Sequence, residues 1–262
     1  MGFFGKLFEK KVCSVCDGEI GLLGNRKLED GNLCKECAKK LSRWFDDRRH
    51  STVEQIKAQL EYREANKEKV AAFCVTRSFG ESTKVLLDED AGLFMVTAES
   101  SPQRLAEENP DVLAFSDVTG CDLDIDENRE ELKIDGKDGQ KVSYNPPRYR
   151  YDYDFYVKIY VRNPFFDDMR LKLNRNPVCI EHQQSKMLLG AQRFSPERDM
   201  EYRQYKQMGE ELQNCLMNAR QEQREEAAAA AAPKTAVTCP YCGATSIPDQ
   251  NGCCEYCGGA LN

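Results

Sequence analysis

Eight cysteines, arranged as two sets of paired CxxC motifs, place the strongest constraint on how this chain can fold. Cys13-Ser-Val-Cys16 is followed after seventeen residues by Cys34-Lys-Glu-Cys37, and Cys239-Pro-Tyr-Cys242 is followed after eleven residues by Cys254-Glu-Tyr-Cys257. Two CxxC pairs supply the four thiolates of a closed tetrahedral zinc site, which leaves no coordination position for a substrate. The sequence therefore predicts two structural Zn(II) ions, with iron in a rubredoxin-like site as the alternative. The predicted metal ligands are Cys13, Cys16, Cys34, Cys37, Cys239, Cys242, Cys254 and Cys257.

Glycine follows three of the four pairs, at Gly18, Gly243 and Gly258. A knuckle turn needs a positive φ there, which glycine adopts most easily. The register of the last pair is ambiguous because Cys253 precedes Cys254, and the CxxC spacing selects Cys254.

The composition favours a reducing compartment and argues against a broad polyanion-binding surface. The chain has 262 residues, 13 cysteines and a formal net charge of −7. A disulfide-stapled secreted protein would need a signal peptide, but the segment from Met1 to Lys11 has no apolar region of the required length. No stretch approaches the roughly 20 apolar residues of a spanning helix. We therefore expect a cytoplasmic protein whose cysteines hold metal, with little general attraction to nucleic acid or anionic membranes.

Shifts in pattern along the chain predict six segments. They are a short apolar segment (1–11), a four-cysteine zinc module (12–50), a linking helix (51–70), a β-domain (71–194), a long helix with an Ala-rich linker (195–232) and a four-cysteine zinc ribbon (233–262).

In the first module, Asp30-Gly31 is expected to close a hairpin, and Cys34 and Cys37 run into a short helix. This order of knuckle, hairpin and helix is typical of a treble clef. A capping box at Ser51 and Glu54 predicts the start of the linking helix. Its narrow apolar stripe is formed by Val53, Ile56 and Leu60, so the other faces are expected to be exposed.

From residue 71 to 174 the apolar period changes to two, which predicts an antiparallel sandwich or barrel. Turn signals such as Asn145-Pro146-Pro147 separate the runs. The expected strands are 72–75, 85–87, 93–96, 112–115, 123–125, 132–134, 142–144, 153–161 and 169–173.

Ser195-Pro196-Glu197 predicts the start of a long helix that runs through Glu226. Its apolar stripe either packs over the open end of the β-domain or forms a coiled-coil contact with a partner helix. The stripe consists of Tyr205, Met208, Leu212, Cys215 and Ala219.

The remaining polar residues form no catalytic constellation. Cys179 lies three residues before His182, either as a thiolate–imidazole pair or an accessory metal site, or by coincidence in a connecting loop. Cys74 and Cys215 are expected to be buried as small apolar residues. Asp122, Asp124 and Asp126 alternate along a strand, either as a cation site or as a solvated face. No P-loop, GxGxxG, GxSxG or HExxH motif occurs, so we expect no enzyme activity.

Three resemblances refine this prediction. The two N-terminal CxxC pairs and the run from Glu19 to Leu28 resemble an uncharacterised bacterial zinc-binding domain found at the start of many Firmicute proteins. The segments 112–118 and 153–161 resemble bacterial pleckstrin-homology-like domains, and the tail resembles appended zinc ribbons. The implied fold class is α+β and multidomain: a treble-clef-like module, a central antiparallel pleckstrin-homology-like barrel or sandwich with a long C-terminal helix, and a zinc ribbon.

Three functions are compatible with this architecture. The first is a non-enzymatic zinc-binding adaptor or scaffold that contacts protein partners. The second is a nucleic-acid-binding regulator that uses the C-terminal ribbon, favoured by mixed basic and aromatic residues at 43–49 and 148–151. The third is a peripheral membrane protein held by Phe3, Phe4, Leu7 and Phe8, which share one face of a helix.

Overall fold

The computed structural model describes residues 11–136, 138–183, 194–231, 236–249 and 252–261. The chain divides into two compact units, Met1–Arg220 and Gln221–Asn262, with one cysteine cluster in each. The apolar face expected at Phe3, Phe4, Leu7 and Phe8 lies outside the described residues. Within the described part of the chain, no helix is long and apolar enough to cross a membrane.

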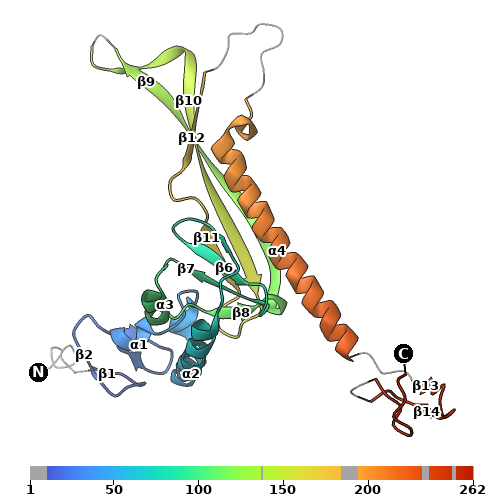
Figure 1. Cartoon of the computed structure of the whole chain (residues 1–262). Helices are drawn as coiled ribbons and strands as arrows, with labels where there is room; N and C mark the ends of the chain where they lie inside the picture. Colours follow the sequence, from blue (N-terminus) through green and yellow to red (C-terminus); the bar gives the residue numbers. More distant parts are fainter. Residues whose placement is uncertain (1–10, 137, 184–193, 232–235, 250–251, 262) are drawn as a thin grey trace, which may run out of the picture. The chain divides into compact units, whose positions relative to one another are not determined.

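The first module consists of four two-residue strands and a short helix. Strand β1 (Lys11–Val12) pairs with β2 (Glu19–Ile20), β3 (Arg26–Lys27) pairs with β4 (Asn32–Leu33), and α1 (Lys35–Lys39) follows. The β3–β4 pair confirms the predicted hairpin. A small core holds the module together because Leu28, Leu33 and Ile56 are fully buried beside Cys13. Figure 1 shows this module at the α2 end of the first unit.

Helix α2 (Val53–Ala72) begins one residue later than the capping box predicted. Its N-cap is Thr52, whose Oγ1 accepts from the Gln55 N–H, while the Gln55 side chain accepts from the Thr52 N–H. The predicted box at Ser51 and Glu54 is therefore wrong. The Ser51 hydroxyl instead donates to the main-chain oxygen of Asp47, the first residue of the 3₁₀ turn Asp47–His50.

One face of α2 is buried although its residues are mostly polar. After Ile56, the buried positions are Gln59, Arg63, Asn66 and Val70, so the expectation that this face is exposed is wrong. Arg63 forms an ion pair of 3.0 Å with Asp111, and their side chains are 8% and 1% exposed.

Further hydrogen bonds attach the same face of α2 to residues 109–112, which lead into the last strand of the first sheet. Asn66 donates to Pro110 O and to Asn109 Oδ1, and its own Oδ1 accepts from the Val112 N–H. Ser42, which follows α1 in the zinc module, donates to Asp111 at 2.7 Å. These hydrogen bonds link the zinc module and α2 to the first sheet. The buried polar groups that form them have hydrogen-bond partners, as buried polar groups in proteins generally do.

The first sheet is antiparallel, with the order β5-β6-β7-β8. Its strands are β5 (Arg77–Phe79), β6 (Lys84–Asp88), β7 (Leu93–Thr97) and β8 (Val112–Ala114). The strand expected at 72–75 is wrong, because α2 continues to Ala72 and β5 begins at Arg77. Helix α3 (Pro102–Glu108), capped by Ser101, was not predicted.

The second sheet is built on two long strands, β9 (Val118–Asp135) and β10 (Lys141–Val161). They pair along most of their length, and Figure 1 shows their ladder continuing past the other strands. On its other edge β10 pairs with β11 (Asp168–Lys172) and β12 (Val178–Gln183). Each long strand therefore replaces two of the short strands that were predicted. The expected turn at 145–147 lies inside β10, where the register shifts between Ser143 and Arg148.

Both sheets contribute to one apolar core, but neither closes into a barrel. The first sheet supplies residues such as Phe94, and the second supplies Phe155 and the other inward residues of its central strand. The predicted buried face of 153–161 is confirmed, because Tyr153, Phe155, Val157, Ile159 and Val161 are all buried. The described strands form open sheets, so the barrel alternative is wrong: β9 and β10 extend far beyond the strands that would have to close it.

Helix α4 (Met200–Ala231) starts after a 3₁₀ turn, Pro196–Arg198, and so begins later than Ser195-Pro196 predicted. Asp199 Oδ1 accepts from the Tyr202 N–H at its first turn. Its apolar stripe packs on the shared core, where Tyr205 and Leu212 are buried and Met208, Cys215 and Ala219 are partly buried. This packing favours the first interpretation of the stripe, a helix that covers the β-structure.

Candidate metal centres

The first cluster brings Cys13, Cys16, Cys34 and Cys37 together from a knuckle and a helix start. Cys13 and Cys16 flank the turn between β1 and β2, whereas Cys34 is the N-cap of α1 and Cys37 lies in its first turn. All four sulfur atoms lie within 4.8 Å of one another, and the Sγ atoms of Cys16 and Cys34 are 3.7 Å apart. Four sulfurs placed about 2.3 Å from a tetrahedral zinc ion are about 3.8 Å apart, so the geometry fits zinc.

Main-chain N–H groups stabilise thiolates in this cluster. The Cys34 N–H donates to Cys13 Sγ and the Cys37 N–H donates to Cys34 Sγ, both at 3.3 Å. Burial opposes ionisation of Cys13, but hydrogen bonds from the main chain of Cys34, Cys16 and Val15 lower its pKa to about 6. Burial and the neighbouring thiols raise the pKa of Cys37. Zinc must therefore displace protons as it binds, and its affinity falls as the pH is lowered.

The knuckle at Cys13 places its positive φ one residue earlier than predicted. Asp17 has a φ of 57°, whereas Gly18 is not among the residues with positive φ. Asp17 donates its N–H to Cys13 O, and the Cys13 N–H donates to Gly18 O. Aspartate tolerates the left-handed region better than most residues.

The second cluster is built from two knuckles of similar design. The N–H groups of Cys239 and Cys254 each donate to a main-chain carbonyl five residues later. Their own carbonyl oxygens each accept from the N–H of a glycine four residues later. Those glycines, Gly243 and Gly258, have φ of 74° and 71°, as predicted. The short strands β13 (Val237–Thr238) and β14 (Thr245–Ser246) lie on either side of the first knuckle.

The sulfur geometry of the second cluster also fits a zinc ion. Cys239 and Cys257 have Sγ atoms 3.5 Å apart, and Cys242 and Cys254 have Sγ atoms 3.8 Å apart. The Ser246 hydroxyl, a contact that the sequence did not suggest, donates to Cys254 Sγ at 3.6 Å and is the largest influence lowering the pKa of that thiol to about 6. Cys253 is not one of the four clustered residues, so the structure selects Cys254, as the spacing did.

Replacing Cys254 with serine is expected to lower the zinc content of the purified chain from two ions to one. The cause is the loss of one of four thiolates in a site that has no spare ligand. Cys253→Ser is the matched control, because it removes the adjacent thiol and should leave two ions. Metal analysis of both variants and of the wild-type chain measures the number of zinc ions that each retains. Equal zinc in the two variants would contradict the assignment.

The other sequence candidates do not form a site. Cys179 and His182 lie on strand β12 instead of a loop, and residues three apart on a strand point to opposite faces. The Cys179 thiol interacts with Asp152, while the His182 ring packs 4.8 Å from the Phe194 ring. These two residues therefore do not form a thiolate–imidazole pair.

The predicted burial of Cys74 is wrong, because that side chain is exposed; Cys215 is partly buried. Asp122, Asp124 and Asp126 are exposed on one face of β9, and Arg170 contacts the last two at 3.4 and 3.5 Å. Among the described residues, the two cysteine clusters are the groups that could hold a metal ion.

Comparison with known proteins agrees with the first cluster. A family described as "Domain of unknown function (DUF4428)" matches residues 11–59, which include the first four cysteines and the start of α2. No curated protein and no solved structure matches the chain. The family match and the two cysteine tetrads both fit zinc-binding modules, one near each end of the chain.

Proposed function

We propose that this chain is a non-enzymatic zinc-binding adaptor, in which two structural zinc modules accompany a β-structure that binds a protein partner. Closed four-thiolate sites support a structural role for the metal, because they leave no position for a substrate. The absence of a catalytic motif in the sequence is consistent with this role. The adaptor would act in the reducing cytoplasm, where cysteines remain available to zinc.

The observation that carries the proposal is the outer edge of strand β9. Near its start, α4 covers this edge: the Gln213 amide donates to Cys121 O, and Arg220 donates to Thr119 O at 3.2 Å. From Leu123 onward, no strand among the described residues pairs with it, because β9 pairs only with β10. A long unpaired edge can accept an added strand from a partner, with the main chain supplying the hydrogen bonds.

The charge on this edge suggests the chemistry of the partner. Between positions 122 and 131 the strand carries six carboxylates and one arginine. A partner that adds a strand here would therefore be an extended peptide with basic side chains placed near those carboxylates. Such charges also keep the edge from pairing with another copy of itself.

The proposal also includes the resemblances to a treble clef and to pleckstrin-homology-like domains. Two antiparallel sheets followed by the long helix α4 support a pleckstrin-homology-like adaptor, and the order of knuckle, hairpin and α1 supports a treble-clef-like module. The bacterial origin implied by the N-terminal resemblance is likewise part of the proposal.

The test is affinity capture of the tagged full-length chain, with nuclease, from a lysate of its source cell. The main-chain groups of Cys121 point away from β10, since its carbonyl oxygen accepts from Gln213 in α4. Main-chain groups in a paired strand alternate in direction, and the β9–β10 register is continuous from Gly120 to Leu132. Glu131, an even number of residues further on, therefore also directs its N–H away from β10. Glu131→Pro removes that donor without breaking the β9–β10 ladder. We expect it to lower recovery of a discrete partner about tenfold, whereas Glu131→Ala recovers the partner normally.

Two results would contradict the proposal. Equal recovery by Glu131→Pro and the wild-type chain would remove the β9 edge from binding. Partners that disappear on nuclease treatment would favour the nucleic-acid-binding alternative. Zinc content should be the same in all variants, since residue 131 is far along the chain from both cysteine clusters.

A further inference from the structure

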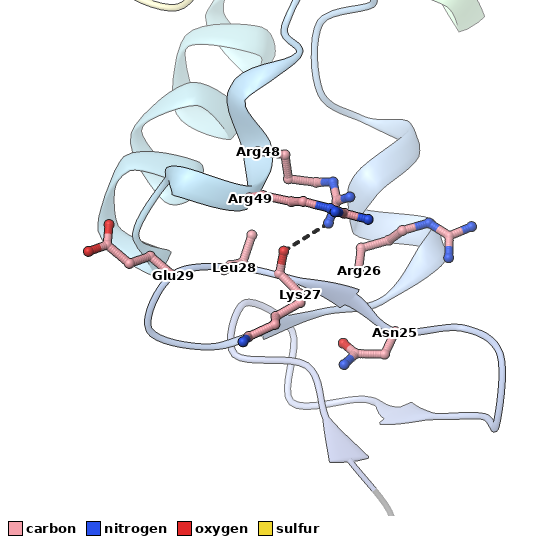
Figure 2. Close-up of a pocket in the computed structure, with 7 residues that line it drawn as sticks. All are labelled: Asn25, Arg26, Lys27, Leu28, Glu29, Arg48 and Arg49. Atoms are coloured by element: carbon pink, nitrogen blue, oxygen red, sulfur yellow. Dashed lines mark hydrogen bonds between the residues drawn. The ribbon is translucent and has the colours of Figure 1, made fainter.

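A basic pocket lies in the first zinc module, and none of its lining residues is a cysteine. Strand β3 and the residue that follows it supply Arg26, Lys27 and Leu28, and the 3₁₀ turn Asp47–His50 supplies Arg48 and Arg49. Its volume is about 850 Å³, and Asn25 and Glu29 complete the lining. Figure 2 shows the three guanidinium groups on the same side of β3, while the Lys27 ammonium points away from them.

The charge of this pocket is not neutralised by the protein. Four cations and one carboxylate line it, a net charge of +3. Among the described residues, no carboxylate forms an ion pair with any of the four cations. In Figure 2 the Glu29 carboxylate points away from the three guanidinium groups.

Arg48 is held in place although its neighbours repel it. Its Nη1 donates to Lys27 O at 3.0 Å, which fixes the guanidinium against β3. Burial, followed by the charges of Arg26 and Arg49, lowers the pKa of Arg48. Holding three guanidinium groups so close is unfavourable unless an anion accompanies them.

We propose that this pocket binds a ligand with two linked phosphate groups. Guanidinium groups form paired hydrogen bonds to phosphate oxygens, and three of them can serve two adjacent phosphates. A diphosphate carries about three negative charges near neutral pH, which matches the charge of the lining.

A discrete diphosphate fits better than a nucleic-acid backbone. Nucleic-acid binding needs cations spread along a track of many phosphates, and affinity then falls steeply with salt. Here the cations are confined to one pocket on a chain with a formal charge of −7. The pocket also lacks an aromatic side chain on which a base could stack.

The test is calorimetric titration of the zinc-loaded full chain with inorganic pyrophosphate. The variant Arg26→Gln/Arg49→Gln removes two guanidinium groups and leaves Arg48 bonded to Lys27 O. We expect its affinity for pyrophosphate to be at least about tenfold lower. The matched control is Arg104→Gln/Arg203→Gln, which removes two exposed arginines outside the pocket and should bind as the wild-type chain does. Zinc analysis of each variant checks that the module is intact.

Competition experiments distinguish the source of the phosphates. Displacement of pyrophosphate by ADP would identify a soluble diphosphate ligand, and displacement by vesicles containing a lipid with a diphosphate headgroup would identify a lipid headgroup. The proposal is overturned if the wild-type chain shows no saturable binding of pyrophosphate, or if both double variants lose affinity equally.

Discussion

Replacing Cys37 with serine is expected to release one zinc ion and unfold the first module. Cys37 is 6% exposed and belongs to the same apolar cluster as Leu28, Leu33 and Ile56. Zinc binding is worth about 10–16 kcal/mol in small zinc modules, which is as large as the whole stability of a typical domain. The small core between β2 and α1 cannot replace that contribution. Metal analysis, together with amide hydrogen exchange over residues 11–50, measures both effects.

Cys74→Ser is the matched control for this experiment. Cys74 is exposed, lies outside both clusters and contacts Asp88 through its main-chain N–H. This variant should keep two zinc ions and the exchange protection of the wild-type chain. Retention of two ions and full protection in Cys37→Ser would mean that the metal does not stabilise the module.

Replacing Asp111 with alanine is expected to destabilise the first unit by about 3–5 kcal/mol. Asp111 accepts from Ser42 Oγ at 2.7 Å and from Arg63 Nη1 at 3.0 Å, and its side chain is 1% exposed. Without it the guanidinium of Arg63 would be buried with no opposite charge. Arg63 also donates to the main-chain oxygens of Lys40 and Glu108, so it cannot turn out to water without losing those bonds. Urea denaturation followed by circular dichroism measures the change.

The double variant Arg63→Met/Asp111→Leu separates the cost of an isolated charge from the contribution of the pair. Replacing both partners with apolar residues of similar size removes the unpaired charge, so it should recover at least about half of the lost stability. A double variant as unstable as Asp111→Ala would show that the hydrogen bonds to Lys40, Ser42 and Glu108 matter more than the charge.

The sequence identified which cysteines cluster, because the signal is local and chemical. A CxxC motif needs a tight turn to bring its two sulfurs onto one ion, so spacing alone indicates which cysteines cluster. The hairpin at Asp30-Gly31 and the buried face of 153–161 were predicted from equally local patterns. Asp17 shows the limit of that reasoning, because aspartate took the left-handed position that glycine occupies in the other knuckles.

The buried face of α2 was missed for the opposite reason. Apolar periodicity identifies a face that packs on apolar groups, but Arg63 and Asn66 are buried by partners some 43–48 residues away in the chain. Such distant partners leave no periodic signal in the sequence. Strand β12 was missed as well. Residues 179–182 show no clear alternation of apolar and polar side chains, and the segment is ordered as a strand because it pairs with β10. Strand β10 was divided because Asn145-Pro146-Pro147 ordinarily marks a turn. Strand β9 was divided because the polar run from 126 to 131 separates its two apolar segments.

X-ray absorption at the zinc edge, with metal analysis of the full-length protein, tests most directly whether the chain holds two zinc ions in closed four-sulfur sites. We expect two zinc ions per chain, each with four sulfur ligands at about 2.3 Å. Oxygen or nitrogen in the first coordination shell, fewer than two ions, or iron in place of zinc would contradict this expectation.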